Sequence, residues 1–173
     1  MNIEGRITGH TDIELHKYGL KEAEKITRML LPLEIQTIIS SDLKRASQTA
    51  AIINSQLRLT LIFDRRLREC SFGSLEGKSA KELIEKHGEL LGKQLQDQWN
   101  SYDFSKFGGE NKAIVLERHL DALKEYASSR HPSPILLVGH TRSLNTLLAH
   151  LGYAPNLIQG QYETIEFDSA ILQ

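Results

Sequence analysis

The chain contains one cysteine, four prolines, one tryptophan and few aromatic residues, and it lacks any long apolar run. Its single cysteine, Cys70, cannot form a disulfide within the chain, which suits a reducing cytoplasm. No apolar stretch approaches the roughly 20 residues of a membrane span, and the polar N-terminus is not typical of a secretory signal. A net charge of −1 gives no electrostatic reason to bind nucleic acid or an anionic membrane. The sequence therefore predicts a cytoplasmic protein without nucleic-acid or membrane partners.

At 173 residues the chain is most simply one domain, 1–173. Short apolar runs alternate with longer amphipathic segments, which predicts an α/β fold with a mainly parallel sheet. Ligands of such sheets bind outside the carboxyl ends of the strands. The expected strands are 36–40, 61–63, 135–138 and 162–167, and the expected helices are 17–31, 43–57, 79–99, 111–128 and 142–151.

The run Pro134-Ile-Leu-Leu-Val ends in Gly139-His140, and a helix-like segment follows at once. This pattern places an imidazole at a strand-to-helix turn, where backbone N–H groups and the helix dipole face an anion. A lone Gly-His pair is more often a simple helix cap. Arg142, two residues on, either extends an anion grip or lies on the surface.

Two further blocks follow predicted strands. Ser40-Ser-Asp-Leu-Lys-Arg45-Ala-Ser-Gln-Thr-Ala puts Arg45 in the first turn of a helix, with Ser41-Asp42 supplying cap chemistry. A guanidinium there can grip two phosphoryl oxygens at once, although an isolated arginine is more often solvated. Leu67-Arg68-Glu69-Cys-Ser-Phe-Gly-Ser-Leu-Glu-Gly77 places Glu69 in a loop, where pairing with Arg66 or Arg68 is the plain alternative to a catalytic role.

These blocks, together with Asn2-Ile-Glu-Gly-Arg-Ile-Thr8-Gly9-His10 and Phe107-Gly-Gly-Glu110, occur in the order seen in the histidine phosphatase (phosphoglycerate mutase-like) superfamily, which the chain resembles. The resemblance implies a three-layer α/β/α sandwich. It makes His140 the second histidine of the site, Arg45 a phosphate-gripping arginine and Glu69 the acid that protonates the leaving oxygen. It also implies that the phosphate pocket is lined by Asn2, Thr8, Gly9 and Thr141. Leu75 replaces a frequent tryptophan, and Thr141-Arg142 stands where relatives often have glycine.

The family's first histidine, within an Arg-His-Gly signature, should lie just upstream of Asn2. We therefore expect the sequence to be truncated before that signature, so that the nucleophile and the first central strand are missing. Neither His10 nor His16 follows a predicted strand, so neither is a convincing substitute. Because the nucleophile is missing, the chain as written is expected to be inactive. Because unpaired strand edges are costly, it is also expected to be poorly stable, to form a homo-oligomer or to rearrange.

The resemblance implies a phosphoric monoester hydrolase that acts on a small phosphorylated metabolite through a phosphohistidine. Neither a metal nor a cofactor is expected, since the histidines, acids and cysteine show no ligand spacing. Two alternatives stay open: an inactive phosphoester-binding or regulatory homologue, and a phosphoglycerate mutase-type phosphotransferase. The mutase is disfavoured because the segment between Gly77 and Phe107 lacks the basic run that mutases of the family use.

Overall fold

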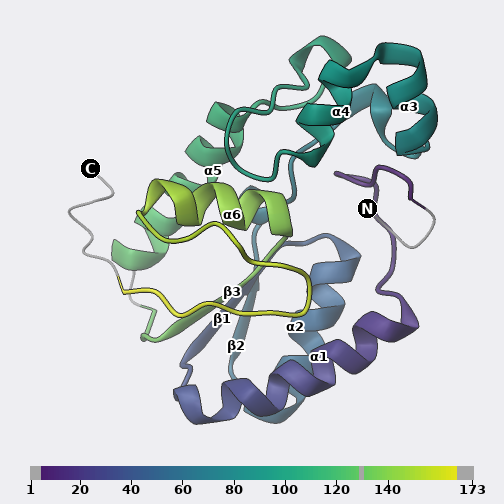
Figure 1. Cartoon of the computed structure of the whole chain (residues 1–173). Coiled ribbons are helices and arrows are strands. Elements are labelled where there is room, and N and C mark those ends of the chain that lie inside the picture. Colours follow the sequence, from purple (N-terminus) through teal and green to yellow (C-terminus); the bar gives the residue numbers. More distant parts are fainter. Residues whose placement is uncertain (1–4, 129–130, 167–173) are drawn as a thin grey trace.

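Three parallel strands form one sheet in the order β2-β1-β3 in the computed structural model, which describes residues 5–128 and 131–166 (Figure 1). The strands are β1 (Thr37–Ser40), β2 (Thr60–Phe63) and β3 (Ile135–Val138). Ser40 is in register with Phe63 on one side and with Val138 on the other. The carboxyl ends of all three strands therefore meet at one edge of the sheet, as the sequence predicts.

Helices connect and cover the strands. The α-helices are α1 (Lys17–Leu30), α2 (Lys44–Leu57), α3 (Ala80–His87), α4 (Glu89–Gln96), α5 (Lys112–Ser128) and α6 (Thr141–His150). Short 3-10 helices occur at Leu31–Leu33, Arg65–Leu67, Gly73–Leu75 and Ser105–Phe107. The predicted helical segment 79–99 is divided into α3 and α4 because Gly88 adopts a positive φ of 85° between them, a conformation that interrupts a right-handed helix.

Side-chain alternation along the strands builds the three layers. Ile38 packs with Ile26 of α1 and Ile53 of α2, whereas its neighbour Ile39 packs with Ala122 of α5. Successive strand residues point to opposite faces, so α1 and α2 cover one face and α5 covers the other. Helix α6 packs against α5 on that second face (Figure 1). The predicted three-layer α/β/α sandwich with a parallel sheet is confirmed.

A separate hydrophobic cluster lies beyond the carboxyl edge of the sheet. It joins α3 and α4 to the loops around Phe72 and Phe104 and includes the buried Tyr102. We call this region the cap, comprising residues 70–110. Its aromatic core is independent of the sheet layers, and it lies above the strand ends where the predicted site residues gather (Figure 1).

The predicted last strand, 162–167, is wrong in its described part. Residues 162–166 form no strand, and residue 167 lies outside the described ranges. The hydroxyl of Tyr153 hydrogen-bonds to both the N–H and the carbonyl of Glu166, so a side chain replaces the ladder contacts there. Within residues 5–128 and 131–166, β3 pairs with β1 on one side and with no strand on the other. This open side explains why β3 is half-buried while β1 is fully buried.

The start of α2 differs from its prediction. Asp42 supplies no cap and instead forms a two-pronged ion pair with Arg68, at 2.6 and 2.5 Å. The Lys44 N–H donates to the carboxylate of Asp12 at 2.7 Å. For Asp42, the charge-assisted pair with the Arg68 guanidinium is stronger than a hydrogen bond to the helix terminus. Asp12, 32 residues before Lys44, accepts the N–H group at the start of α2 instead.

Replacing Gly73 with alanine should destabilise the cap by about 2 kcal/mol more than the same change at Gly77. Both glycines have positive φ, 56° and 77°, so both variants carry the same backbone strain. Only at Gly73 would the new Cβ meet a backbone atom, the Phe107 carbonyl oxygen at 2.1 Å, whereas nothing lies within 4 Å at Gly77. Urea unfolding of the two variants measures the difference, and equal midpoints would contradict this close approach of the two loops.

Candidate active site

Two predicted site segments meet at the strand ends. Ser41 follows β1, and His140 follows β3 as the residue before α6. The Ser41 N–H donates to the carbonyl of Val138 at 2.9 Å, and the His140 Nε2 lies 2.9 Å from the Ser41 Oγ. The parallel register thus brings side chains 99 residues apart into contact. Ser41 is part of the predicted motif, but its role as the partner of His140 was not predicted.

His140 is buried, with 7% of its surface exposed. Burial, and after it the positive charge of Arg45, holds the pKa of His140 well below its usual range. The Ser41 Oγ accepts the N–H of Leu43, which leaves its own hydrogen free to donate to a neutral imidazole. Burial and this hydrogen bond therefore favour the uncharged imidazole.

Arg45 lies in the first turn of α2, as predicted, and reaches the loop at residues 8–12. Its Nη2 donates to the carbonyl of Gly9 at 2.7 Å and its Nη1 to the carbonyl of Thr11 at 3.1 Å. Burial lowers the pKa of Arg45, and the nearby carboxylates of Glu69, Asp12 and Glu76 act in the opposite direction. A guanidinium has five N–H groups, so these two bonds leave three donors available for an anion.

Glu69 occupies the N-terminus of α6. Its Oε1 accepts the N–H of Cys70 at 2.9 Å and of Ser143 at 3.0 Å, and its Oε2 accepts the N–H of Arg142 at 3.3 Å. First-turn amides and the helix dipole stabilise negative charge at this position. The anion that faces these amides is therefore a carboxylate of the protein itself, bound at the start of the helix that follows His140.

The plain alternative for Glu69, pairing with Arg66 or Arg68, is wrong. Arg66 forms ion pairs with Asp64 and Glu125, and Arg68 pairs with Asp42. Both arginines are engaged elsewhere, which leaves the Glu69 carboxylate to the backbone amides of α6.

Arg118 of α5 fixes the backbone that carries Glu69. Its guanidinium binds both carboxylate oxygens of Glu110, at 2.9 and 3.0 Å. It also donates to the carbonyls of Arg68 and Glu69, at 2.6 and 2.8 Å. This role was not predicted, because Glu110 precedes α5 and no helical spacing links it to Arg118.

Arg142 takes neither of its two predicted positions. It is 3% exposed, and its guanidinium lies 4.8–5.2 Å from the ring centres of Phe72, Tyr102 and Phe104. It donates to the carbonyls of Gln94 and Leu95 at the end of α4, at 3.1 and 2.8 Å. Arg142 therefore fastens the cap to the start of α6 and is neither on the surface nor part of the anion grip.

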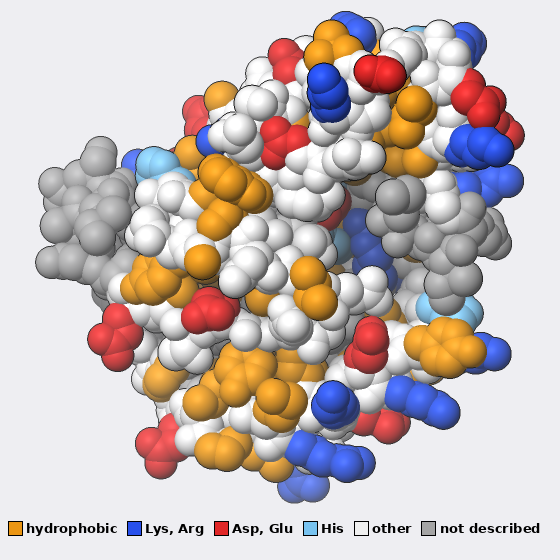
Figure 2. All heavy atoms as spheres, viewed as in Figure 1, with side chains coloured by type: hydrophobic (Ala, Val, Ile, Leu, Met, Phe, Trp, Pro, Cys, Tyr) orange, Lys and Arg blue, Asp and Glu red, His pale blue; other side chains and the backbone are white. Residues whose placement is uncertain are grey.

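The structure brings His140, Arg45 and Glu69 together, with Gly9 and Thr8 in the loop that Arg45 holds and Thr141 as the first residue of α6. Asn2 lies outside the described residues. Figure 2 shows a hollow between the cap and the sheet layer, with Lys or Arg and His side chains at its floor. The arrangement offers a cation, a buried imidazole and a carboxylate around one space, which is suited to binding a phosphoryl group and exchanging a proton with it.

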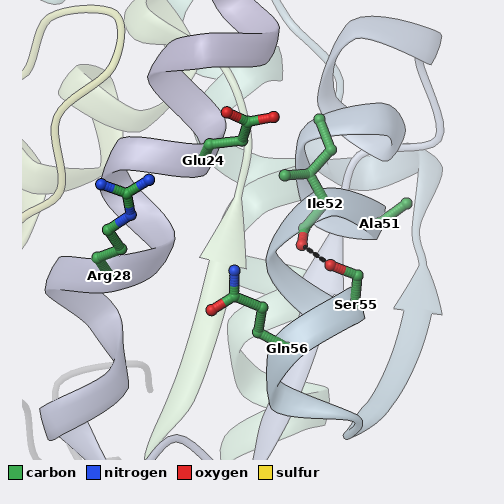
Figure 3. Close-up of a pocket in the computed structure, with 6 residues that line it drawn as sticks. All are labelled: Glu24, Arg28, Ala51, Ile52, Ser55 and Gln56. Atoms are coloured by element: carbon green, nitrogen blue, oxygen red, sulfur yellow. Dashed lines mark hydrogen bonds between the residues drawn. The ribbon is translucent and has the colours of Figure 1, made fainter.

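Other features of the described residues do not compete with this site. No group of three or more His, Cys, Asp or Glu side chains in the described ranges could hold a metal ion. No helix in those ranges is long and apolar enough to cross a membrane. A groove of about 490 Å³ between α1 and α2, lined by Glu24, Arg28 and Gln56 among others, contains none of the predicted site residues (Figure 3).

Acidification should destabilise the protein below about pH 6.5. His119 on α5 is fully buried, and burial lowers its pKa to about 3, so in this range the unfolded chain binds a proton that the folded chain does not. Stability is therefore lost as the pH falls, by about 2 kcal/mol between pH 6.5 and 5 for His119, with His140 contributing in the same direction. Urea unfolding at several pH values, repeated with His119→Leu, measures this. A variant with the wild-type pH slope would refute the contribution of His119.

Several known proteins are similar to this chain over most of its length. A protein named adenosylcobalamin/alpha-ribazole phosphatase, from Escherichia coli, is 26% identical over 150 residues, covering 87% of this chain and 72% of the relative. A 2,3-bisphosphoglycerate-dependent phosphoglycerate mutase of Cytophaga hutchinsonii is 32% identical over 154 residues, covering 87% and 71%. The solved structure of a mycobacterial glucosyl-3-phosphoglycerate phosphatase with VO3 superposes with a TM-score of 0.77 at 27% identity, covering 87% of this chain and 76% of that one. The profile of the histidine phosphatase superfamily (branch 1) matches residues 1–164, and the chain belongs to that superfamily.

Proposed function

We propose that the protein hydrolyses a small phosphomonoester, and that Arg45, His140 and Glu69 are its phosphate-binding and proton-transfer groups. One observation carries the proposal: the Glu69 carboxylate is held at the N-terminus of α6, the helix that follows the buried His140, and Arg45 interacts electrostatically with both side chains. Arg45 and His140 would stabilise the negative charge of the phosphoryl oxygens. Two of the relatives carry phosphatase names, which supports hydrolysis.

The proposed reaction has two steps. In the first, Glu69 takes up a proton as the doubly charged ester binds next to it, the ester O–P bond breaks, the phosphoryl group passes to a histidine nitrogen, and Glu69 gives that proton to the leaving oxygen. In the second, water attacks phosphorus, Glu69 takes a proton from it, and inorganic phosphate leaves the regenerated histidine. Among the described residues, Arg45 and His140 would hold the phosphoryl group through both steps, and Glu69 would act first as the acid and then as the base.

The acid role of Glu69 can be tested with two leaving groups. Glu69→Gln keeps an oxygen for the α6 amides but cannot donate a proton as a carboxylic acid does. We expect kcat for an alkyl phosphate to fall about 100-fold or more, and kcat for p-nitrophenyl phosphate, whose leaving group needs little protonation, to fall far less. Glu89→Gln, an acid in the first turn of α4, is the control. Equal losses on both substrates would refute the role.

A second candidate is a phosphoester-binding protein without turnover. It is favoured by one observation: of the three strands within the described residues, only β3 is followed by a histidine. Calorimetry with inorganic phosphate and a hydrolysis assay with p-nitrophenyl phosphate separate the two functions. Saturable binding without hydrolysis would support the binding protein, whereas hydrolysis supports the phosphatase.

A further inference from the structure

A second groove lies at the start of α6, the helix that follows His140. It has a volume of about 380 Å³, within the range of sites for small ligands. One wall is the turn at residues 96–100, the other is the segment 155–158, and Thr141 and Asn145 of α6 lie between them. Thr141 follows His140 directly, and the Glu69 carboxylate accepts the next two N–H groups of α6, so the groove borders the helix start at which these two residues lie.

Both walls are fastened to α6. Next to the first wall, the carbonyls of Gln94 and Leu95 accept hydrogen bonds from the buried guanidinium of Arg142. On the second wall, the amide of Asn145 makes two hydrogen bonds to the backbone of Leu157, both at 2.9 Å. Asn145 is buried, with 2% of its surface exposed. The groove is therefore held open by the same helix that carries His140, and a preformed groove costs a ligand little ordering.

The first wall is also rigid within itself. The carboxylate of Asp97 accepts the backbone N–H groups of Trp99, Asn100 and Ser101, at 3.0, 2.6 and 2.7 Å. These bonds lower the pKa of Asp97 against the opposing effect of burial. Among the described residues that line the groove, Asp97 is the only ionisable one, and its carboxylate is engaged by the backbone N–H groups of the turn.

The remaining lining is neutral and rich in hydrogen-bonding groups. Amide side chains come from both walls: Gln96, Gln98, Asn100 and Asn156. Each amide can both donate and accept, which matches the hydroxyl groups of a polyol. Trp99 is 37% exposed and adds an aromatic surface of the kind that packs against C–H groups. Among the described residues that line the groove none is a cation, so a carboxylate on the ligand would find no ion-pair partner among them.

We propose that this groove binds the non-phosphorylated part of the substrate, and that the preferred substrates are phosphate esters of neutral sugars or polyols. The inference rests on the proposed function for its phosphate-binding half. It predicts discrimination against phosphate esters that carry a carboxylate or an ammonium group near the phosphate.

Trp99 provides the test because it is the only tryptophan of the chain, so intrinsic fluorescence reports on the groove. Glucose 6-phosphate should change Trp99 emission saturably and bind about tenfold more tightly than inorganic phosphate, which should leave emission unchanged. 3-Phosphoglycerate and phosphoserine should bind no more tightly than inorganic phosphate. Equal affinity for glucose 6-phosphate and inorganic phosphate, or a preference for the charged esters, would overturn the inference.

Two variants localise the effect. Asn156→Ala removes a hydrogen-bonding group from the wall opposite Trp99 and keeps the fluorophore, and it should lose most of the tenfold preference. Tyr18→Leu, at an aromatic residue on α1 that is 61% exposed, is the control and should keep the preference. Hydrolysis of p-nitrophenyl phosphate with no preference among esters would refute this inference alone. Binding of glucose 6-phosphate without hydrolysis of any ester would refute the proposed hydrolysis and leave the groove assignment intact.

Discussion

Arg45→Met should weaken the binding of inorganic phosphate about 100-fold or more. The variant removes a half-buried guanidinium that retains three N–H donors after binding the carbonyls of Gly9 and Thr11. Each charge-assisted hydrogen bond to phosphate contributes about 1.5–3 kcal/mol, so losing two of them accounts for a change of this size. Isothermal titration calorimetry at low ionic strength measures the dissociation constant directly.

Lys44→Met is the matched control because it removes a cation of the same helical turn whose side chain is exposed. Its phosphate affinity should stay within about threefold of the wild type, since an exposed charge is screened by solvent. Arg45→Lys should recover only part of the loss, because an ammonium cannot grip two oxygens in a fixed fork. Unchanged affinity in Arg45→Met, with the wild-type urea midpoint, would rule Arg45 out of the phosphate site.

Arg142→Met should lower the free energy of unfolding by about 3–5 kcal/mol. Methionine fills much of the volume but cannot donate to the carbonyls of Gln94 and Leu95, which the variant leaves without their donor at the end of α4. It also removes the cation from the faces of three aromatic rings. Burial lowers the pKa of Arg142, because removing the guanidinium charge from water is unfavourable. The hydrogen bonds and ring contacts offset this desolvation cost.

Urea unfolding measures the loss, with Lys93→Met, an exposed cation of α4, as the control. Arg142→Lys should be almost as unstable as Arg142→Met, because one ammonium cannot reach both carbonyls and lie over the rings at once. A stability of Arg142→Met within about 1 kcal/mol of the wild type would contradict the fastening of the cap to α6 by this residue.

The sequence predicted the sheet layer well because periodicity and strand-end motifs are local signals. Short apolar runs placed β1, β2 and β3 to within a residue or two, and the resulting parallel register brings the segments of Ser41 and His140 together. The residues singled out by resemblance, Arg45 and Glu69, lie near His140 because each follows or flanks a strand end.

Long-range polar contacts account for what the sequence could not predict. Arg142 reads as a surface or anion-binding residue until the fold gathers Phe72, Tyr102 and Phe104 around it. Asp42 has the pattern of a helix cap, yet Arg68 lies close enough to take its carboxylate. The partner of each of these side chains is set by which groups lie near it in the folded protein. The spacing of residues along the chain does not predict that arrangement.

An NMR titration is the most direct test of phosphate binding at His140. Long-range proton–nitrogen correlation spectra of the histidine imidazoles are recorded while inorganic phosphate is added to the full chain. We expect a saturable shift of the His140 ring nitrogens toward the protonated form, because a bound anion raises a pKa that burial and Arg45 hold low. Saturable phosphate binding that leaves the His140 signals unchanged would contradict it.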